Sequence, residues 1–81
     1  MDALHNSIEK ARKVRFEALR MPPYEFGSWA KKLHDEALAL SKDICGDYHE
    51  YNKWMRIADL HQITCIDGML LAVESMRLKL Q

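Results

Sequence analysis

Two pairs of side chains have the types and the spacing to bind a metal ion. Cys45 and His49 are four residues apart, and so are His61 and Cys65. Thiolate and imidazole are zinc ligands. On one continuous helix, however, His61 would lie roughly 20 Å from the corner at Gly46, whereas zinc ligands converge within about 2.3 Å of the ion. We therefore expect no metal and no other cofactor. The same separation excludes a disulfide between Cys45 and Cys65, so both thiols are expected to be free and buried.

Catalytic groups are also sparse. His61 with Asp67 or Cys65 could form part of a dyad, but no serine or cysteine stands in a nucleophile-elbow motif and no glycine-rich phosphate loop is present. The carboxylates of Asp35 and Glu36 are adjacent on an expected helix and therefore point apart. We expect that the protein is not an enzyme and has no catalytic residues.

Composition and charge favour one small folded domain over residues 1–81. Hydrophobic residues make up 48% of the chain, which is too many for a disordered protein. The 12 basic and 12 acidic residues cancel, which argues against a protein that mainly binds duplex DNA. Residues 1–32 hold seven Lys/Arg and four Asp/Glu, whereas residues 33–60 hold three and six. This asymmetry indicates complementarity between neighbouring helices or subunits or, alternatively, an anionic partner at the N-terminal helix.

The sequence favours a cytoplasmic location. Residues 1–10 lack the apolar stretch of a signal peptide. The longest apolar run, residues 69–73, is far too short to span a membrane. Two cysteines are too few for the disulfide framework of a small secreted protein.

The N-terminal half predicts two helices separated by prolines. Apolar residues recur every three or four positions from about residue 3 to residue 20, and Asp2 can cap this helix. Pro22 and Pro23 then interrupt helical structure, although Pro23 can occupy the first position of a second helix over about 23–45.

A third, long helix is predicted over about 47–80. Gly46 is a typical residue just after a helix end, and Asp47 with Glu50 forms a variant of the capping box. The predicted fold is all-α: an antiparallel helical hairpin with an extra N-terminal helix, three helices in all, assembled into an oligomeric bundle.

The long third helix carries more apolar surface than two short helices can cover. Besides one broad apolar face it has a second apolar strip and a row of small residues around Gly68. Gly68 lowers helix stability by about 1 kcal/mol relative to alanine, which close helix contact could offset. We therefore expect a homo-oligomer, most simply a dimer. The alternative is a three-helix monomer with this helix at its centre. The predicted interface consists of Ile57, Leu60, His61, Thr64, Gly68, Leu71, Ala72, Ser75 and Leu78.

These features favour a small, non-enzymatic protein-binding factor, an adaptor or inhibitor of the type found as phage or mobile-element accessory proteins. One alternative is sequestration of a small anionic or nucleotide-like ligand in a basic, aromatic pocket at the oligomer interface. Another is nucleic-acid binding through the basic N-terminal helix. Residues expected to contact a partner or ligand are Lys10, Arg12, Lys13, Arg15, Tyr48, Tyr51 and Trp54.

Overall fold

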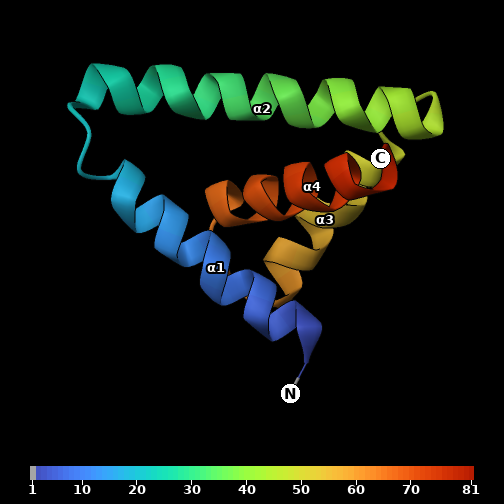
Figure 1. Cartoon of the computed structure of the whole chain (residues 1–81), viewed down its shortest axis with the longest axis horizontal. Helices are drawn as coiled ribbons and strands as arrows, with labels where there is room; N and C mark the ends of the chain where they lie inside the picture. Colours follow the sequence, from blue (N-terminus) through green and yellow to red (C-terminus); the bar gives the residue numbers. More distant parts are fainter. Residues whose placement is uncertain (1) are drawn as a thin grey trace.

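The described part of the chain, residues 2–81 of a computed structural model, forms four helices (Figure 1). They are α1 (Ala3–Ala18), α2 (Pro23–Cys45), α3 (His49–Leu60) and α4 (Cys65–Lys79). The chain is all-α, as predicted, but the three-helix arrangement is wrong. The segment predicted as one helix over residues 47–80 is two helices joined by a sharp corner.

The ends of α1 and α2 follow local sequence signals. The Asp2 carboxylate accepts a hydrogen bond from the backbone N–H of Leu4 at 3.0 Å, which caps α1. Helix α1 ends at Ala18, two residues before the predicted boundary. Pro23 occupies the first turn of α2, where its missing N–H leaves no bond unmade. The predicted bounds of α2 are confirmed.

The corner between α2 and α3 depends on three residues. Gly46 has a φ of 75°, the left-handed conformation that ends α2. The Asp47 carboxylate accepts a hydrogen bond from the His49 N–H at 2.8 Å. Buried Ser41 of α2 links that helix to the corner and to α3. Its hydroxyl accepts a hydrogen bond from the Tyr51 N–H at 2.9 Å and donates one to the Asp47 carbonyl at 3.3 Å.

The corner between α3 and α4 overturns the predicted long helix. Gln62 adopts a φ of 54°, and the N–H of Ile63 bonds to the carbonyl of Ala58 at 3.0 Å. This pattern is a Schellman motif, in which a left-handed residue closes a helix end. Thr64 immediately caps the next helix, because its hydroxyl accepts from the Asp67 N–H at 3.1 Å. The chain therefore ends one helix and starts another within four residues.

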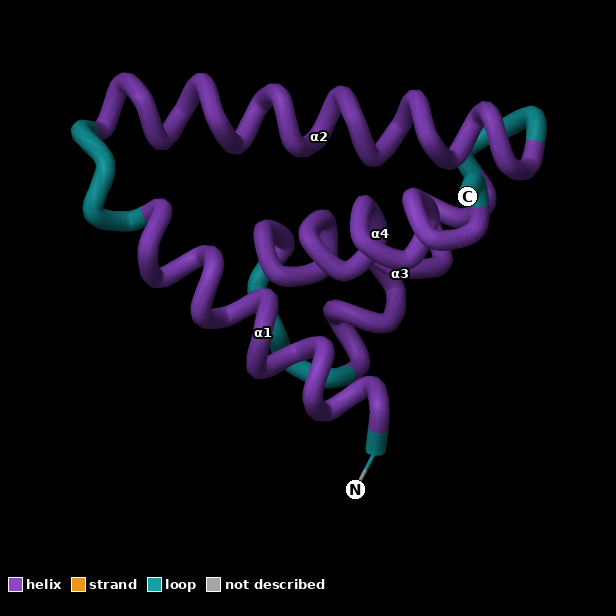
Figure 2. The backbone as a smooth tube through the Cα atoms, in the orientation of Figure 1, coloured by secondary structure: helices purple, strands orange, loops and turns teal. Residues whose placement is uncertain are grey.

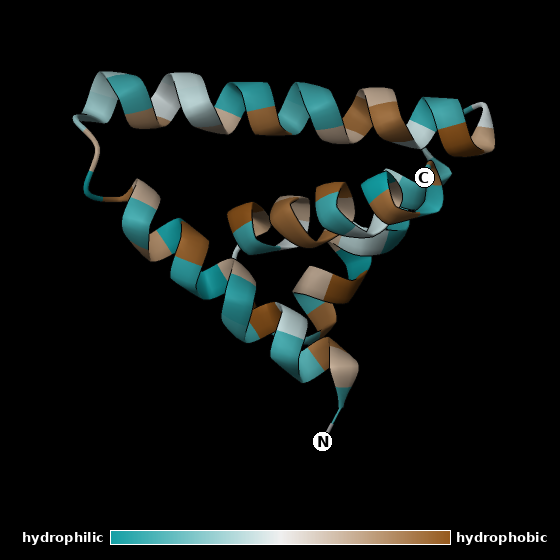
Figure 3. Ribbon diagram, in the orientation of Figure 1, coloured by the Kyte–Doolittle hydropathy of each residue, from teal (hydrophilic) through white to brown (hydrophobic). Residues whose placement is uncertain are grey.

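Helix α4 is the central element. It packs against each of the other three helices, and α2 also packs against α3. In Figure 2, α4 lies between α1 and α2, and Figure 3 shows hydrophobic residues along most of its length. One buried cluster joins Ala37 of α2 to Val73 and Met76 of α4. Another joins Ile8 of α1 to Leu71 of α4. Two faces of α4 are thus covered within a single chain.

Candidate binding groove

A groove with an apolar centre lies between α1 and α2. The two helices diverge from the loop over residues 19–22, and α4 forms the floor between them (Figure 1). The cavity has a volume of about 490 Å³. Its lining comes from all three helices and from Gln81, which follows α4: Lys10, Ala11, Val14, Trp29, Leu33, Glu36, Leu70, Val73, Glu74, Arg77, Leu78 and Gln81.

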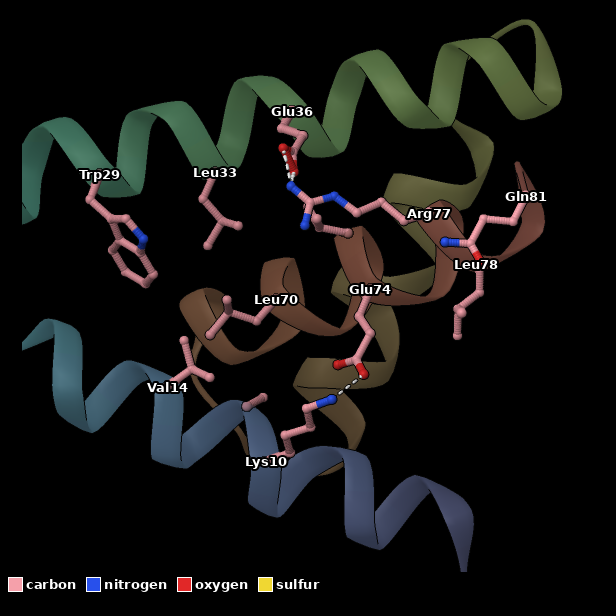
Figure 4. A pocket seen from close by; sticks show the side chains of 12 residues that line it. Lys10, Val14, Trp29, Leu33, Glu36, Leu70, Glu74, Arg77, Leu78 and Gln81 are labelled. Carbon is pink, nitrogen blue, oxygen red and sulfur yellow. Dashed lines mark hydrogen bonds and ion pairs between the residues drawn. The ribbon is translucent and has the colours of Figure 1, made fainter.

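The centre of the groove is apolar. In Figure 4, Trp29 and Leu33 point from α2 toward α1, Val14 points from α1 toward them, and Leu70 of α4 lies between. The Trp29 side chain is only partly covered; its ring stands 5.6 Å from that of Phe26, and neither aromatic belongs to a buried cluster. These side chains therefore keep apolar surface that a partner could bury.

Ion pairs flank this apolar centre. Lys10 of α1 pairs with Glu74 of α4 at 2.8 Å. Arg77 of α4 pairs with Glu36 of α2. Both pairs are largely exposed, so each contributes roughly 0–1 kcal/mol and can exchange partners at little cost. An apolar centre with a polar rim is the usual organisation of a protein-binding surface.

A more buried pair fixes α1 beside the groove. The Arg15 Nε donates to the Asp67 carboxylate at 2.9 Å, and the Asp67 side chain is 1% exposed. Thr64 holds the Asp67 backbone at the start of α4. Ile8 and Ala11 add apolar contacts to α4. Together these contacts position Val14, one residue before Arg15 in the sequence.

The predicted oligomer interface is not a single surface in this fold. Leu71 and Ala72 are 2% and 0% exposed within the chain, so they have no surface for a partner. Thr64 caps α4, and Ile57 and Ser75 are half-buried. Besides Thr64, the exposed members of the set lie apart along the chain: Leu60 at the end of α3, His61 in the corner that follows, and Leu78 near the end of α4.

Gly68 makes its close contact within the chain. A Cβ at this position would lie 2.7 Å from the Ala58 Cβ and 3.1 Å from the Met55 Cε. Only glycine allows α4 to approach α3 this closely. The close contact expected from the small residues is therefore between α3 and α4 of one chain.

The residues predicted to bind a ligand do not form one site. Lys10 pairs with Glu74, Arg12 with Glu9, and Arg15 with Asp67, so three of the four α1 cations are held by carboxylates of the same chain. Lys10 lines the groove, and Lys13 is exposed. The aromatic members lie elsewhere: Tyr48 at the α2–α3 corner, Tyr51 in a second cleft, and Trp54 against both buried clusters.

The second cleft is broad and chemically mixed. It has a volume of about 710 Å³, and its lining includes His34, Tyr51, Arg56 and Cys65. The His34 ring meets the Tyr51 ring edge-on at 5.6 Å. Burial raises the pKa of the Tyr51 phenol, and the neighbouring Cys65 thiol raises it further. Both cysteines are free, as predicted, but both are exposed, so the expectation of buried thiols is wrong.

Within residues 2–81, no three His, Cys, Asp or Glu side chains gather closely enough to hold a metal ion. None of the described helices is both long and apolar enough to cross a membrane.

Sequence reasoning missed the groove itself. Trp29 and Leu33 belong to the apolar stripe of α2, and Val14 to that of α1, so all three read as core residues. The signal that could have identified them is the proline pair at 22–23, because a stiff connection after α1 can hold two apolar stripes apart.

No protein-family model, curated protein sequence or solved structure matches this chain.

Proposed function

We propose that this protein is a non-catalytic binding factor, an adaptor or inhibitor, which holds an α-helix of a partner protein in the groove between α1 and α2. The observation that carries the proposal is the half-covered apolar centre formed by Trp29, Leu33, Val14 and Leu70. Two diverging helices above a third form a trough, and amphipathic helices commonly bind in such grooves through apolar residues on one face.

The partly covered aromatic of α2 strengthens this proposal. Tryptophan is enriched among the residues that contribute most to binding energy at protein interfaces. Trp29 extends into the groove while the rest of α2 is anchored elsewhere, by the fully buried Ala37 and Ser41 (Figure 4). A rigid helix that presents a tryptophan loses little conformational entropy on binding.

Photo-crosslinking in the native host tests the proposal. A photoreactive p-benzoylphenylalanine replaces Val14, which is 38% exposed in the groove, or Lys42, which is exposed in the other half of α2. We expect position 14, and not position 42, to crosslink to a helical segment of one other protein, identified by mass spectrometry of the crosslinked peptides. Equal products from both positions, or crosslinks from position 14 to this chain alone, would reject the proposal.

Self-association is a separate proposal, supported by the exposed Leu60 and Leu78. Of the apolar residues that led to it from the sequence, Leu71 and Ala72 are buried within one chain. Light scattering should give a mass above 9.5 kDa if it is right. A monomer mass at all concentrations would reject it and leave the groove proposal standing.

A further inference from the structure

We infer that the helix which binds in the groove is acidic along its flanks. This inference rests on the proposed function and adds the chemistry of the partner. It begins from the charges at the groove. Both carboxylates that line it are already engaged, Glu74 by Lys10 and Glu36 by Arg77. Lys32 lies in a recess that adjoins Trp29, and none of the carboxylates in the described chain pairs with it.

Helix α1, the loop after it and the first half of α2 together carry an excess of positive charge. Residues 3–32 hold seven Lys/Arg and three Asp/Glu. Lys13 and Lys31 are exposed and, like Lys32, make no ion pair with the described residues. Of the three acids, Glu9 pairs with Arg12, and Glu25 lies in the first turn of α2, where the helix dipole stabilises it. Neither Glu17 nor Glu25 lines the groove, so neither faces the partner directly.

Apolar and charged contacts can be made together. Val14, Leu33 and Leu70 would accept apolar side chains spaced three, four and seven residues apart on the incoming helix. Its acidic flanks would then face Lys32 on the α2 side and Lys10 on the α1 side. The Lys10 side chain is 66% exposed and its ammonium has three donors, so Lys10 can bind a second carboxylate while it keeps Glu74.

A second copy of this chain does not offer such a helix. Outside α1 and the loop that follows it, its exposed large apolar residues are separated along the chain: Tyr24 at the start of α2, Tyr48 at the α2–α3 corner, Leu60 at the end of α3, and Leu78 and Leu80 at the end of α4. The helix with several exposed apolar residues, α1, is basic. In the described chain, no helix combines an exposed apolar row with acidic flanks, so the partner is a different protein.

Fluorescence anisotropy with designed helical peptides tests the inference on the full chain. Three fluorescein-labelled peptides share a leucine face and differ in their flanks, which carry Glu, Gln or Lys. We expect the Glu peptide to bind about tenfold more tightly than the Gln peptide, and the Lys peptide to bind more weakly still. The preference should shrink as salt is raised, because salt screens exposed charges.

Charge-reversal variants show which lysine causes the preference for the Glu peptide. Lys32→Glu should weaken binding of the Glu peptide about tenfold and leave the Gln peptide nearly unchanged. Lys42→Glu is the matched control, since Lys42 is an exposed lysine without an ion pair in the other half of α2; it should leave both peptides unchanged.

The remaining outcomes separate the inference from the proposed function. Equal affinity for the Glu and Gln peptides, with both lost in Trp29→Ala, would overturn the acidic flank and keep the groove. Failure of every peptide to bind would overturn both. A labelled DNA duplex that binds more tightly than the Glu peptide and displaces it would overturn the inference in favour of nucleic acid.

Discussion

The two halves of α2 continue one apolar stripe into different surroundings. In residues 33–45, Ala37 and Ser41 are wholly buried, and Leu40 and Ile44 pack against the core formed with α4. In residues 23–32, none of the side chains is buried. Helix periodicity therefore reports which face of α2 is apolar, but it does not report whether the chain itself covers that face. Our proposal is that the half whose apolar face is incompletely covered binds a partner.

The largest expected difference between the halves comes from a buried charge. Ala37 is 0% exposed, whereas Ala30 is half-buried in the first half. Ala37→Glu should lower the free energy of unfolding by about 3 kcal/mol or more, because an unpaired carboxylate replaces a core methyl. Ala30→Glu should change it by less than about 1 kcal/mol. Urea denaturation measures both, and similar losses would show that the halves are equally packed.

Serine-to-alanine substitutions compare the two halves of α2 with a smaller expected change in stability. Ser41→Ala removes the hydroxyl that bonds to the Tyr51 N–H and the Asp47 carbonyl. It should lower stability by about 1–3 kcal/mol, because buried polar groups lose their partners. Ser28→Ala, at an exposed position of the first half, should stay within about 0.5 kcal/mol of the parent protein. If Ser28→Ala were the more harmful change in thermal denaturation, the comparison would be wrong.

Replacing glycine by alanine should change the stability in opposite directions at two positions of this region. Gly46 has a positive φ, so Gly46→Ala should destabilise by about 1 kcal/mol. Gly27 lies inside α2, and a Cβ there would meet nothing within 4 Å. Gly27→Ala should therefore stabilise by about 0.5–1 kcal/mol through higher helix propensity. Denaturation midpoints test both signs. Destabilisation by Gly27→Ala would indicate that the first half of α2 is not a regular helix.

Local signals in the sequence predicted much of the fold. Asp2, Pro23 and Gly46 marked helix ends correctly, because caps and backbone preferences act over a few residues. The α3–α4 corner was missed, although Thr64 and Asp67 have capping-box spacing. The corner was not recognised because its left-handed position is occupied by Gln62, whereas this position usually holds glycine or asparagine.

The groove was harder to predict than the fold. Lys10 and Arg15 were expected to contact an anionic group, and their partners are Glu74 and Asp67 of α4, more than 50 residues away in sequence. Complementary charge between helices was foreseen, but its location in α4 was not. Whether α1 and α2 touch or diverge depends on tertiary packing, which local periodicity does not encode.

The most direct test of the central claim is the Trp29→Ala variant, measured for both unfolding and binding. If Trp29 belongs to a docking surface, Trp29→Ala should lower the free energy of unfolding by clearly less than the roughly 3–5 kcal/mol expected for a core tryptophan, because the ring is half-buried and belongs to neither buried cluster. Binding of the Glu peptide should fall by about tenfold or more. A loss of about 3 kcal/mol or more, as expected for a core tryptophan, together with unchanged binding, would contradict the claim.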